Sequence, residues 1–239
     1  IEGFHEPAYG MNYNPTYYRD LFENYGFKPH YHQYTYERPL TKELSPAYQE
    51  QVKEVQRNPN YEFHPIDSQN LETYAKHFQH IYNRGWEYQK GLHFITEKQA
   101  LEIFRSLDPV LIPDLIWFGY YRGTPVAFFI MVPDLNQIFK YFRGRFGWWE
   151  RLKLRYHQWR GTARKTFGLT VGVDADHQEQ GVEGALMLAA KSHMQKLDRW
   201  DTIEMTWIGD FNPRMISLVE SLGAEHVKTH ITYYLPLSA

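Results

Sequence analysis

The chain has 239 residues and a formal net charge of −2, so it is long enough for one large domain with a substantial core. It contains no cysteine, which excludes a disulfide scaffold, a thiolate zinc site and a cysteine nucleophile, and fits a reducing compartment. The near-neutral charge gives no overall attraction to nucleic acid, and no apolar run approaches the ~20 residues of a membrane span. We therefore expect a cytoplasmic protein without a specific nucleic-acid partner.

The first forty residues are related to the last thirty by an internal repeat. The matching pairs, at a constant offset of 197 residues, are Leu21–Phe27 with Leu218–Ala224 and Thr35–Leu40 with Thr232–Leu237. Each copy predicts an Asn N-cap with Pro at the first helical position (Asn14-Pro15 and Asn212-Pro213), an amphipathic helix, a Gly stop and a strand. We expect residues 1–40 to be the tail of an upstream lobe.

The next segments predict a linker and the first half of a domain. In residues 41–60, Ser45-Pro46 opens a linker helix with Tyr48, Val52 and Val55 on one stripe. Tyr61–Ile66 is a candidate strand, and two helices follow, one capped by Asp67 and one by the capping box that begins at Thr96. Between residues 115 and 133, two apolar runs flank Arg122-Gly123-Thr124, which predicts a hairpin.

Residues 135–163 form a basic and aromatic insertion. Its bases are Lys140, Arg143, Arg145, Arg151, Lys153, Arg155 and Arg160, against the single acid Glu150. The spacing places Trp148, Leu152, Tyr156 and Trp159 on one helical face. Two interpretations remain open: a helical hairpin that packs its aromatic residues on the domain, or a surface for a membrane, an acidic partner or a nucleic acid.

Residues 164–187 predict a strand, a polar loop and the start of a helix, a junction at which backbone N–H groups can face an anion. In the strand, four apolar residues alternate with Thr and Gly, so we expect one apolar face and one nearly bare face open to a ligand. A strand over 202–208, a helix over 212–222 and terminal strand structure over 225–237 complete the pattern. This order predicts a mixed α/β sheet.

The element order resembles the C-terminal part of the GNAT superfamily (GCN5-related N-acetyltransferases). The family's pyrophosphate signature is Gln or Arg, two residues, Gly, one residue, then Gly or Ala, and Gln178 to Val182 match it up to the last position. The resemblance covers about residues 61–237, places a GNAT-like domain at 61–239 and implies a mixed, mostly antiparallel sheet flanked by helices. With the terminal repeat it implies a tandem arrangement, in which 1–40 is the helix-strand remnant of a second GNAT-like lobe. Residues 132–136 and 228–233 look like a bacterial group of such proteins.

The resemblance also implies a co-substrate, acetyl-CoA or another acyl-CoA, and the residues that contact it. These are Val171, Val173, Gln178, Gln180, Gly181, Val182, Gly184, Ala185 and Asn212. Two positions depart from the family pattern. Glu183 occupies the final Gly/Ala position, where its carboxylate opposes a pyrophosphate by bulk and by charge, and Val219 stands where many members have a Tyr that protonates the leaving thiolate.

The implied reaction is direct attack of an unidentified amine on the thioester. Our candidate for the base is Glu204, with Asp210 second; the alternatives are a structural hydrogen bond for Glu204 and a loop-shaping role for Asp210. Two other functions remain open: a non-catalytic GNAT-like module with a degenerate CoA site, and a tandem-type aminoacyl transferase. The expected partners are the acyl-CoA, the amine and the missing upstream lobe, with an acidic surface or a membrane at 135–163.

Histidine pairs give no prediction of a metal site. His77 and His80 are three residues apart on a probable helix, and His30 and His32 share a strand face. Neither pair has an indicated third ligand, so packing and surface roles are favoured for all four residues.

Overall fold

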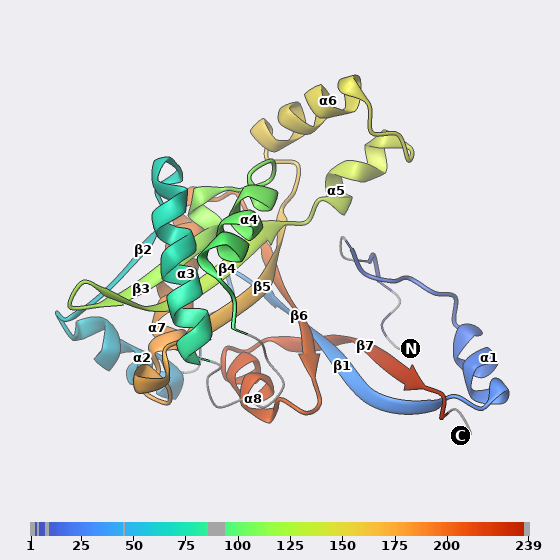
Figure 1. Cartoon of the computed structure of the whole chain (residues 1–239), viewed down its shortest axis with the longest axis horizontal. Helices are drawn as coiled ribbons and strands as arrows, with labels where there is room; N and C mark the ends of the chain where they lie inside the picture. Colours follow the sequence, from blue (N-terminus) through green and yellow to red (C-terminus); the bar gives the residue numbers. More distant parts are fainter. Residues whose placement is uncertain (1–2, 4, 8–9, 45, 86–93, 237–239) are drawn as a thin grey trace. The chain divides into compact units, whose positions relative to one another are not determined.

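The computed structural model describes residues 3, 5–7, 10–44, 46–85 and 94–236. The strands form one seven-stranded, mostly antiparallel sheet in the order β2-β3-β4-β5-β6-β1-β7, accompanied by helices (Figure 1). This arrangement confirms the fold class predicted from the sequence. The chain divides into two compact units, which we call the terminal unit (1–42, 133–167 and 200–239) and the central unit (43–132 and 168–199).

The central unit contains the first three strands of this order. Its elements are α2 (Pro46–Arg57), β2 (Tyr61–Pro65), η1 (Ser68–Asn70), α3 (Leu71–Gly85), α4 (Glu97–Leu107), η2 (Pro113–Leu115), β3 (Ile116–Tyr121), β4 (Thr124–Pro133), the end of β5 (Lys165–Val173), η4 (Ala175–His177) and α7 (Val182–Leu197). The predicted hairpin and capping box are both present. Arg122 and Gly123 have φ values of 50° and 79°, as a two-residue turn of type I′ requires, and Thr96 exchanges two hydrogen bonds with Gln99.

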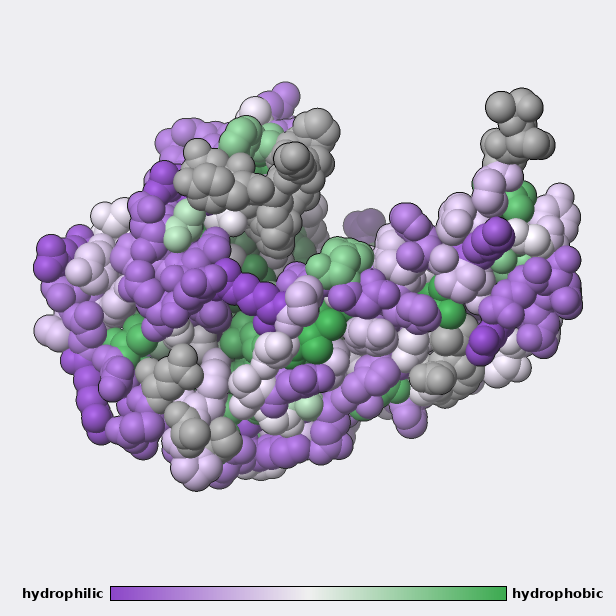
Figure 2. All heavy atoms as spheres, turned by 90° about the horizontal axis from the view of Figure 1, so that it is seen from below, coloured by the Kyte–Doolittle hydropathy of each residue, from purple (hydrophilic) through white to green (hydrophobic). Residues whose placement is uncertain are grey.

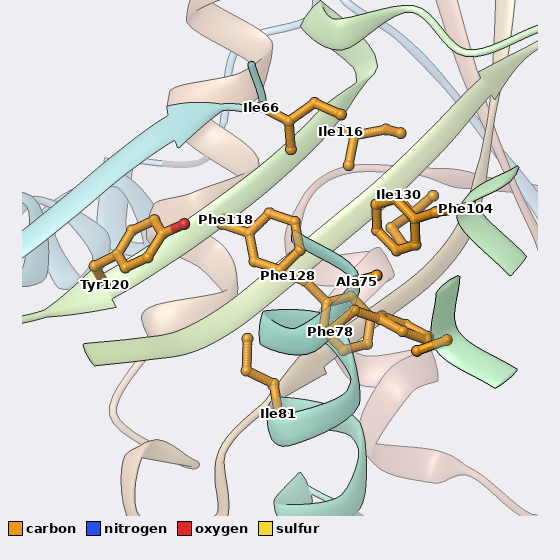
Figure 3. Close-up of a cluster of buried hydrophobic side chains, with 11 residues drawn as sticks. Ile66, Ala75, Phe78, Ile81, Phe104, Ile116, Phe118, Tyr120, Phe128 and Ile130 are labelled. Atoms are coloured by element: carbon orange, nitrogen blue, oxygen red, sulfur yellow. The ribbon is translucent and has the colours of Figure 1, made fainter. Parts of the chain in front are cut away.

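The core of the central unit lies where α3 and α4 pack on β3 and β4. Its buried residues are Ile66, Ala75, Phe78, Ile81, Ala100, Phe104, Ile116, Phe118, Tyr120, Phe128 and Ile130. Figure 3 shows Phe78 of α3 close to Phe128 of β4, with ring centroids 4.8 Å apart. Burying one such ring contributes roughly 1.5–3 kcal/mol, so this aromatic cluster is a main source of the unit's stability.

The terminal unit brings the two ends of the chain into one sheet. Its elements are α1 (Tyr18–Tyr25), β1 (Lys28–Pro39), α5 (Asn136–Phe139), η3 (Lys140–Phe142), α6 (Trp148–Trp159), the start of β5, β6 (Thr202–Gly209), α8 (Pro213–Ser221) and β7 (Glu225–Tyr234). Strand β1 lies between β6 and β7 and pairs antiparallel with both. The residues that the sequence assigns to an upstream tail therefore contribute an inner strand here.

The two copies of the repeat share the order helix, Gly, strand. Helix α8 starts as predicted, with Pro213 first and the Asn212 side chain accepting a hydrogen bond from the Met215 N–H (3.2 Å). The predicted start of the first copy is wrong: Pro15 opens a turn, and α1 begins three residues later at Tyr18. Both helices are followed by a glycine with positive φ: Gly26 (105°) is the C-cap of α1, and Gly223 (76°) comes directly after Leu222, the C-cap of α8. Leu237, the last residue of the predicted repeat, lies outside the described residues.

The described helices are all too short or too polar to cross a bilayer. On the face drawn in Figure 2, hydrophilic residues predominate and hydrophobic residues show only as small scattered groups. In the insertion, Trp148, Trp149 and Trp159 of α6 are exposed, so the interpretation that its aromatic residues pack on the domain is wrong for these three.

Candidate functional site

The predicted strand, loop and helix of residues 164–187 are present, and the loop backbone is shaped by two left-handed residues. Glu179 has φ 64°, and Gly181, the N-cap of α7, has φ 80°. The first intrahelical bond runs from Ala185 N–H to the Gly181 carbonyl (3.0 Å). The N–H groups before Ala185 belong to the N-terminal turn of α7, where the helix dipole favours an anion.

Two glutamines that the resemblance assigns to CoA use their side-chain amides within the loop. Gln178 Nε2 donates to the carbonyls of Gly85 (3.1 Å) and Val173 (3.0 Å), which ties the end of β5 to the end of α3. Gln180 Nε2 donates to the Asp176 carbonyl (2.8 Å). These bonds fix the loop conformation, and they engage the side-chain amides of two residues that the resemblance assigns to CoA contacts.

Two loop carboxylates are paired with one arginine from α3. Arg84 Nε donates to Asp174 Oδ2 at 3.2 Å, and its Nη2 lies 2.5 Å from Asp176 Oδ2. The Asp174 side chain is buried and also accepts a hydrogen bond from the Asp176 N–H (3.0 Å). The arginine offsets acidic charge beside the loop, so this part of the loop is stabilised without an added cation.

Helix α2 packs directly on the first turns of α7. A Cβ atom on Gly184 would lie 2.3 Å from Tyr48 Oη and 2.9 Å from Val52 Cγ2, so only glycine allows this approach. Gln56 Nε2 donates to the Ala185 carbonyl (3.3 Å). Val182 and Ala185 are fully buried. Val182, Gly184 and Ala185, which the resemblance assigns to CoA contacts, therefore offer a ligand their backbone atoms and not their side chains.

The carboxylate of Glu183, on α7, influences the pKa of Tyr48 on helix α2. Burial raises the pKa of Tyr48 to about 12, and the negative charge of Glu183 adds to this rise. The negative charge of Glu183 therefore acts on helix α2 as well as on the loop.

The two faces of β5 differ from the sequence expectation. A Cβ atom on Gly172 would lie 2.6 Å from the ring of Phe128, so the face expected to be bare is filled by the aromatic core. Leu169 is 46% exposed and Val171 is half-buried. Of the apolar side chains in the strand's second half, Leu169 and Val171 are thus accessible and Val173 is buried, and the accessible pair suits an aliphatic ligand.

Glu204, the candidate base, lies in a buried ionic cluster of the terminal unit. It is 1% exposed; Lys228 Nζ donates to its Oε1 at 2.7 Å and Lys165 Nζ to its Oε2 at 3.2 Å. Lys165 also donates to Glu37 (2.5 Å). Burial lowers the pKa of Lys165, but its contacts with Glu37 and Glu204 outweigh that effect and the pKa is raised. The geometry matches the alternative left open for Glu204, a carboxylate held by structural hydrogen bonds.

Asp134, at the end of β4, belongs to the same cluster. Burial raises its pKa to about 6, although the Asn136 N–H (3.0 Å) and the charge of Lys165 oppose the rise. It was not selected from the sequence as a titratable candidate. A signal was available for Glu204: it lies between Ile203 and Met205 in β6, which predicts a buried carboxylate that needs a partner.

The other residues of the predicted site have structural partners. Asp210 accepts hydrogen bonds from the His32 backbone N–H (2.9 Å), which is the main reason that its pKa is lowered, and contacts His32 Nδ1 (3.3 Å). This fits the loop-shaping alternative. Asn212 caps α8, and Val219 is 1% exposed, so no hydroxyl group is offered at that position.

The histidines of the central unit contact different groups. His77 Nδ1 lies 3.1 Å from the Tyr120 hydroxyl, and burial lowers the pKa of His77. His80 Nε2 lies 3.8 Å from Asp174 Oδ2. In the terminal unit, the rings of His30 and Tyr234 are 5.6 Å apart. These contacts are of the packing and surface kind.

The terminal unit also has an open pocket of about 370 Å³, between the segment before α1 and strand β7. Met11, Trp207 and His230 are among its lining residues, as is Lys228. Because Lys228 is paired with Glu204, the pocket extends to the ionic cluster.

Comparison with known proteins gives distant matches. No protein-family model matches the chain. It is 20% identical over 231 residues to a bacterial ceramide synthase of Caulobacter vibrioides, covering 95% of this chain and 60% of the relative. It is 26% identical over 174 residues to protein YghO of Escherichia coli, covering 69% of this chain and 44% of that protein. The chain spans about half the length of the curated relatives it matches.

Solved structures with the same architecture include two of the GNAT type. A GCN5-related N-acetyltransferase from Sphaerobacter thermophilus superposes with a TM-score of 0.58 and 14% identity, over 92% of this chain and 56% of that one. A tandem GNAT protein from the clavulanic acid biosynthesis pathway superposes with a TM-score of 0.57 and 9% identity, over 94% of this chain and 59% of that one. With its mixed sheet, its β5–loop–α7 junction and these likenesses, the chain has the GNAT fold.

Proposed function

We propose that the protein transfers the acyl group of an acyl-CoA to an amine. The observation that carries this proposal is the β5–α7 junction, where Gly181 turns the N-terminus of α7 towards the loop in a chain with the GNAT fold. The N-terminal turn of a helix, with its backbone N–H groups and the positive end of the helix dipole, suits the pyrophosphate of CoA. The accessible apolar residues Leu169 and Val171 on β5 suit the aliphatic part of the thioester arm.

In this reaction the amine nitrogen attacks the thioester carbonyl carbon. A C–N bond forms, the C–S bond breaks, the ammonium proton goes to a base, and the thiolate leaves as CoA. Backbone N–H groups can stabilise the oxyanion that develops on the carbonyl oxygen.

For the acceptor, we favour a long-chain amine. The support is the likeness to a bacterial ceramide synthase, which extends over 95% of this chain, because a ceramide is a long-chain amino alcohol acylated on nitrogen. A fatty acyl-CoA is then the expected donor. Incubation of the full-length protein with palmitoyl-CoA or acetyl-CoA and a long-chain amine, with release of free thiol and the amide product measured, tests both choices.

For the base, Asp134 joins Glu204 and Asp210 as a candidate. Its pKa of about 6 is close to the range in which a carboxylate serves as a base at neutral pH. The two lysines on Glu204 and the lowered pKa of Asp210 disfavour the other two. A folded Asp134→Asn variant with unchanged KM and a strongly reduced kcat supports this assignment, and unchanged kcat rejects it.

A second candidate is a GNAT-like binding module without catalysis. Its support is specific: Glu204 is held by two lysines, and Val219 replaces a hydroxyl with a buried alkyl side chain. Under this alternative no thioester turnover occurs with any amine, whether or not acyl-CoA binds.

A pair of glycine variants tests the junction. Gly181 and Gly123 have nearly equal φ values (80° and 79°), and neither would bring a Cβ atom closer than 3.8 Å to another group. Alanine at either position therefore carries a similar backbone cost, of about 1 kcal/mol. We expect only Gly181→Ala to weaken acyl-CoA binding measured by calorimetry. Equal affinities for the two variants and the parent would reject the junction as the CoA site.

A further inference from the structure

The insertion concentrates positive charge in a chain that is otherwise acidic. Residues 135–163 hold seven of the 26 Lys and Arg residues and one of the 28 Asp and Glu residues. The rest of the chain therefore has 19 bases and 27 acids, a net charge of −8. An anionic surface would attract this segment and repel the remainder, which orients an approaching molecule.

Helix α6 places its large apolar and aromatic side chains on one side. At about 100° per residue, Trp148, Trp149, Leu152, Tyr156 and Trp159 fall within an arc of about 100°. All five are exposed, from 44% for Leu152 to 82% for Trp159. This is a continuous amphipathic face in contact with solvent, and we call it the α6 aromatic face.

Basic residues border the α6 aromatic face on both edges. By the same helical geometry, Arg151 and Arg155 lie along one edge, and Lys153 and the C-cap residue Arg160 lie along the other. All four side chains are exposed. Long basic side chains beside an aromatic strip can reach outwards to phosphate groups while the rings lie deeper.

The remaining side of α6 accounts for the packing of the helix. Leu154 is buried, and the ring of His157 stacks on that of Tyr141 with centroids 5.0 Å apart and an interplanar angle of 5°. His157 Nδ1 also lies 3.0 Å from the Thr162 hydroxyl. The helix is thus held to its own segment through the side opposite the α6 aromatic face, which leaves that face available.

The single acid of the insertion is used in helix capping. Glu150 Oε2 accepts a hydrogen bond from the Gly147 N–H (2.9 Å), and this bond is the main reason that the pKa of Glu150 is lowered. The carboxylate is therefore directed at the helix start. Its negative charge interacts favourably with the positive end of the helix dipole, and its Oε1 lies 3.8 Å from Lys153 Nζ, so of the four bordering bases it offsets Lys153 in part.

We propose that the α6 aromatic face binds the surface of a bilayer that contains anionic phospholipids, with the helix lying in the interface plane. Trp and Tyr rings favour the boundary between headgroups and acyl chains, and the bordering bases match the lipid phosphates. Stacking of nucleic-acid bases uses aromatic residues along a groove, whereas this face is convex. The surface does not depend on the proposed acyl transfer, but it would bring a lipid amine to the protein.

Vesicle co-sedimentation of the full chain tests the surface. We expect binding to phosphatidylcholine vesicles that contain phosphatidylglycerol, at least about tenfold weaker binding to phosphatidylcholine alone, and weakening between about 0.1 and about 0.5 M salt. Brominated acyl chains should quench tryptophan fluorescence, because the three exposed Trp residues of α6 enter the interface. These readouts require no acyl transfer, so they separate failure of the surface from failure of the proposed activity.

Two variants and their matched controls isolate the α6 aromatic face. Replacing Trp148, Trp149 and Trp159 by Ala should weaken binding at least about tenfold and abolish the bromine quenching. The control replaces three similarly exposed aromatic residues elsewhere, Tyr25, Phe94 and Phe211, and should change neither. Arg151→Glu with Arg155→Glu should weaken binding at least about tenfold, whereas Lys98→Glu with Lys196→Glu should not.

Several results would overturn the proposal. One is equal binding to neutral and anionic vesicles; another is loss of binding in the controls as large as in the α6 variants. Binding to a polyanion such as heparin or polyuridylate in preference to vesicles, without bromine quenching, would instead assign the face to an acidic polymer. Circular dichroism should show that all variants keep the parent's helix content, because every replaced side chain is exposed.

Discussion

Glu204→Gln should destabilise the protein strongly, although the substitution preserves the shape of the side chain. Glu204 is 1% exposed and accepts from Lys228 (2.7 Å, side chain 6% exposed) and Lys165 (3.2 Å, 24% exposed). Gln removes the charge that compensates Lys228, whereas Lys165 keeps Glu37. Breaking a buried pair from one side costs about 3–5 kcal/mol, which corresponds to a fall in melting temperature of about 6–20 °C for a chain of this size.

Thermal and urea unfolding followed by circular dichroism measure this effect. Glu225→Gln is the matched control: it removes the same charge from an exposed pair with Lys42 (2.8 Å), and its melting temperature should stay close to that of the parent. Removing both buried partners, in Glu204→Leu with Lys228→Met, should recover much of the loss. A fall of less than about 2 °C for Glu204→Gln would refute the argument that this cluster is held together by its charges.

Three further predictions concern the loop and the cluster. The folded pKa of Asp134 is raised to about 6, so its contribution to stability is present below its unfolded pKa and is lost as pH rises through 6. Asp134→Asn should therefore stabilise the protein by up to about 3 kcal/mol at pH 8 and by much less at pH 4. Urea unfolding at both pH values measures this difference. Gly184→Ala should destabilise by about 1–3 kcal/mol through its clashes with Tyr48 and Val52, and an added Tyr48→Ala should recover part of that loss, which double-mutant unfolding measures. Glu183→Gly should increase the affinity for acyl-CoA, measured by calorimetry, more than Glu179→Gly, which removes the same charge from the loop. Equal gains for the two variants would mean that charge alone opposes the ligand, and not the bulk of the side chain at the signature position.

Features with local causes could be predicted from the sequence. The Arg122-Gly123 hairpin, the Thr96 capping box and the Asn212 N-cap each depend on residues within a few positions of one another, and all three are present. The predicted start of α1 was wrong, although it also depended on a local signal. Asn14-Pro15 is a local signal for a turn as well as for a helix start, and the turn formed.

Features that depend on distant neighbours could not be predicted. The bare face of β5 is filled because Phe128, on another strand, covers Gly172, and no pattern within β5 indicates that neighbour. Gln178 matches the signature in sequence, yet its amide binds the carbonyl of Gly85, 93 residues away. The partners of Glu204 likewise come from other strands, Lys165 from β5 and Lys228 from β7, so its two lysines were not predicted.

The position of β1 inside the sheet has a consequence for how the chain folds during synthesis. Pro39 pairs with Thr202 and Glu37 pairs with Glu225, so the partners of β1 are made at least 163 residues after it. At about 5–20 residues per second, that strand waits roughly 10–35 s with both edges unpaired. Its charged and polar residues, among them Lys28, Glu37 and Arg38, suit such a delay, because charged edges resist pairing with other chains. Completion of the terminal unit is therefore a late and non-local event, which places it among slowly folding topologies.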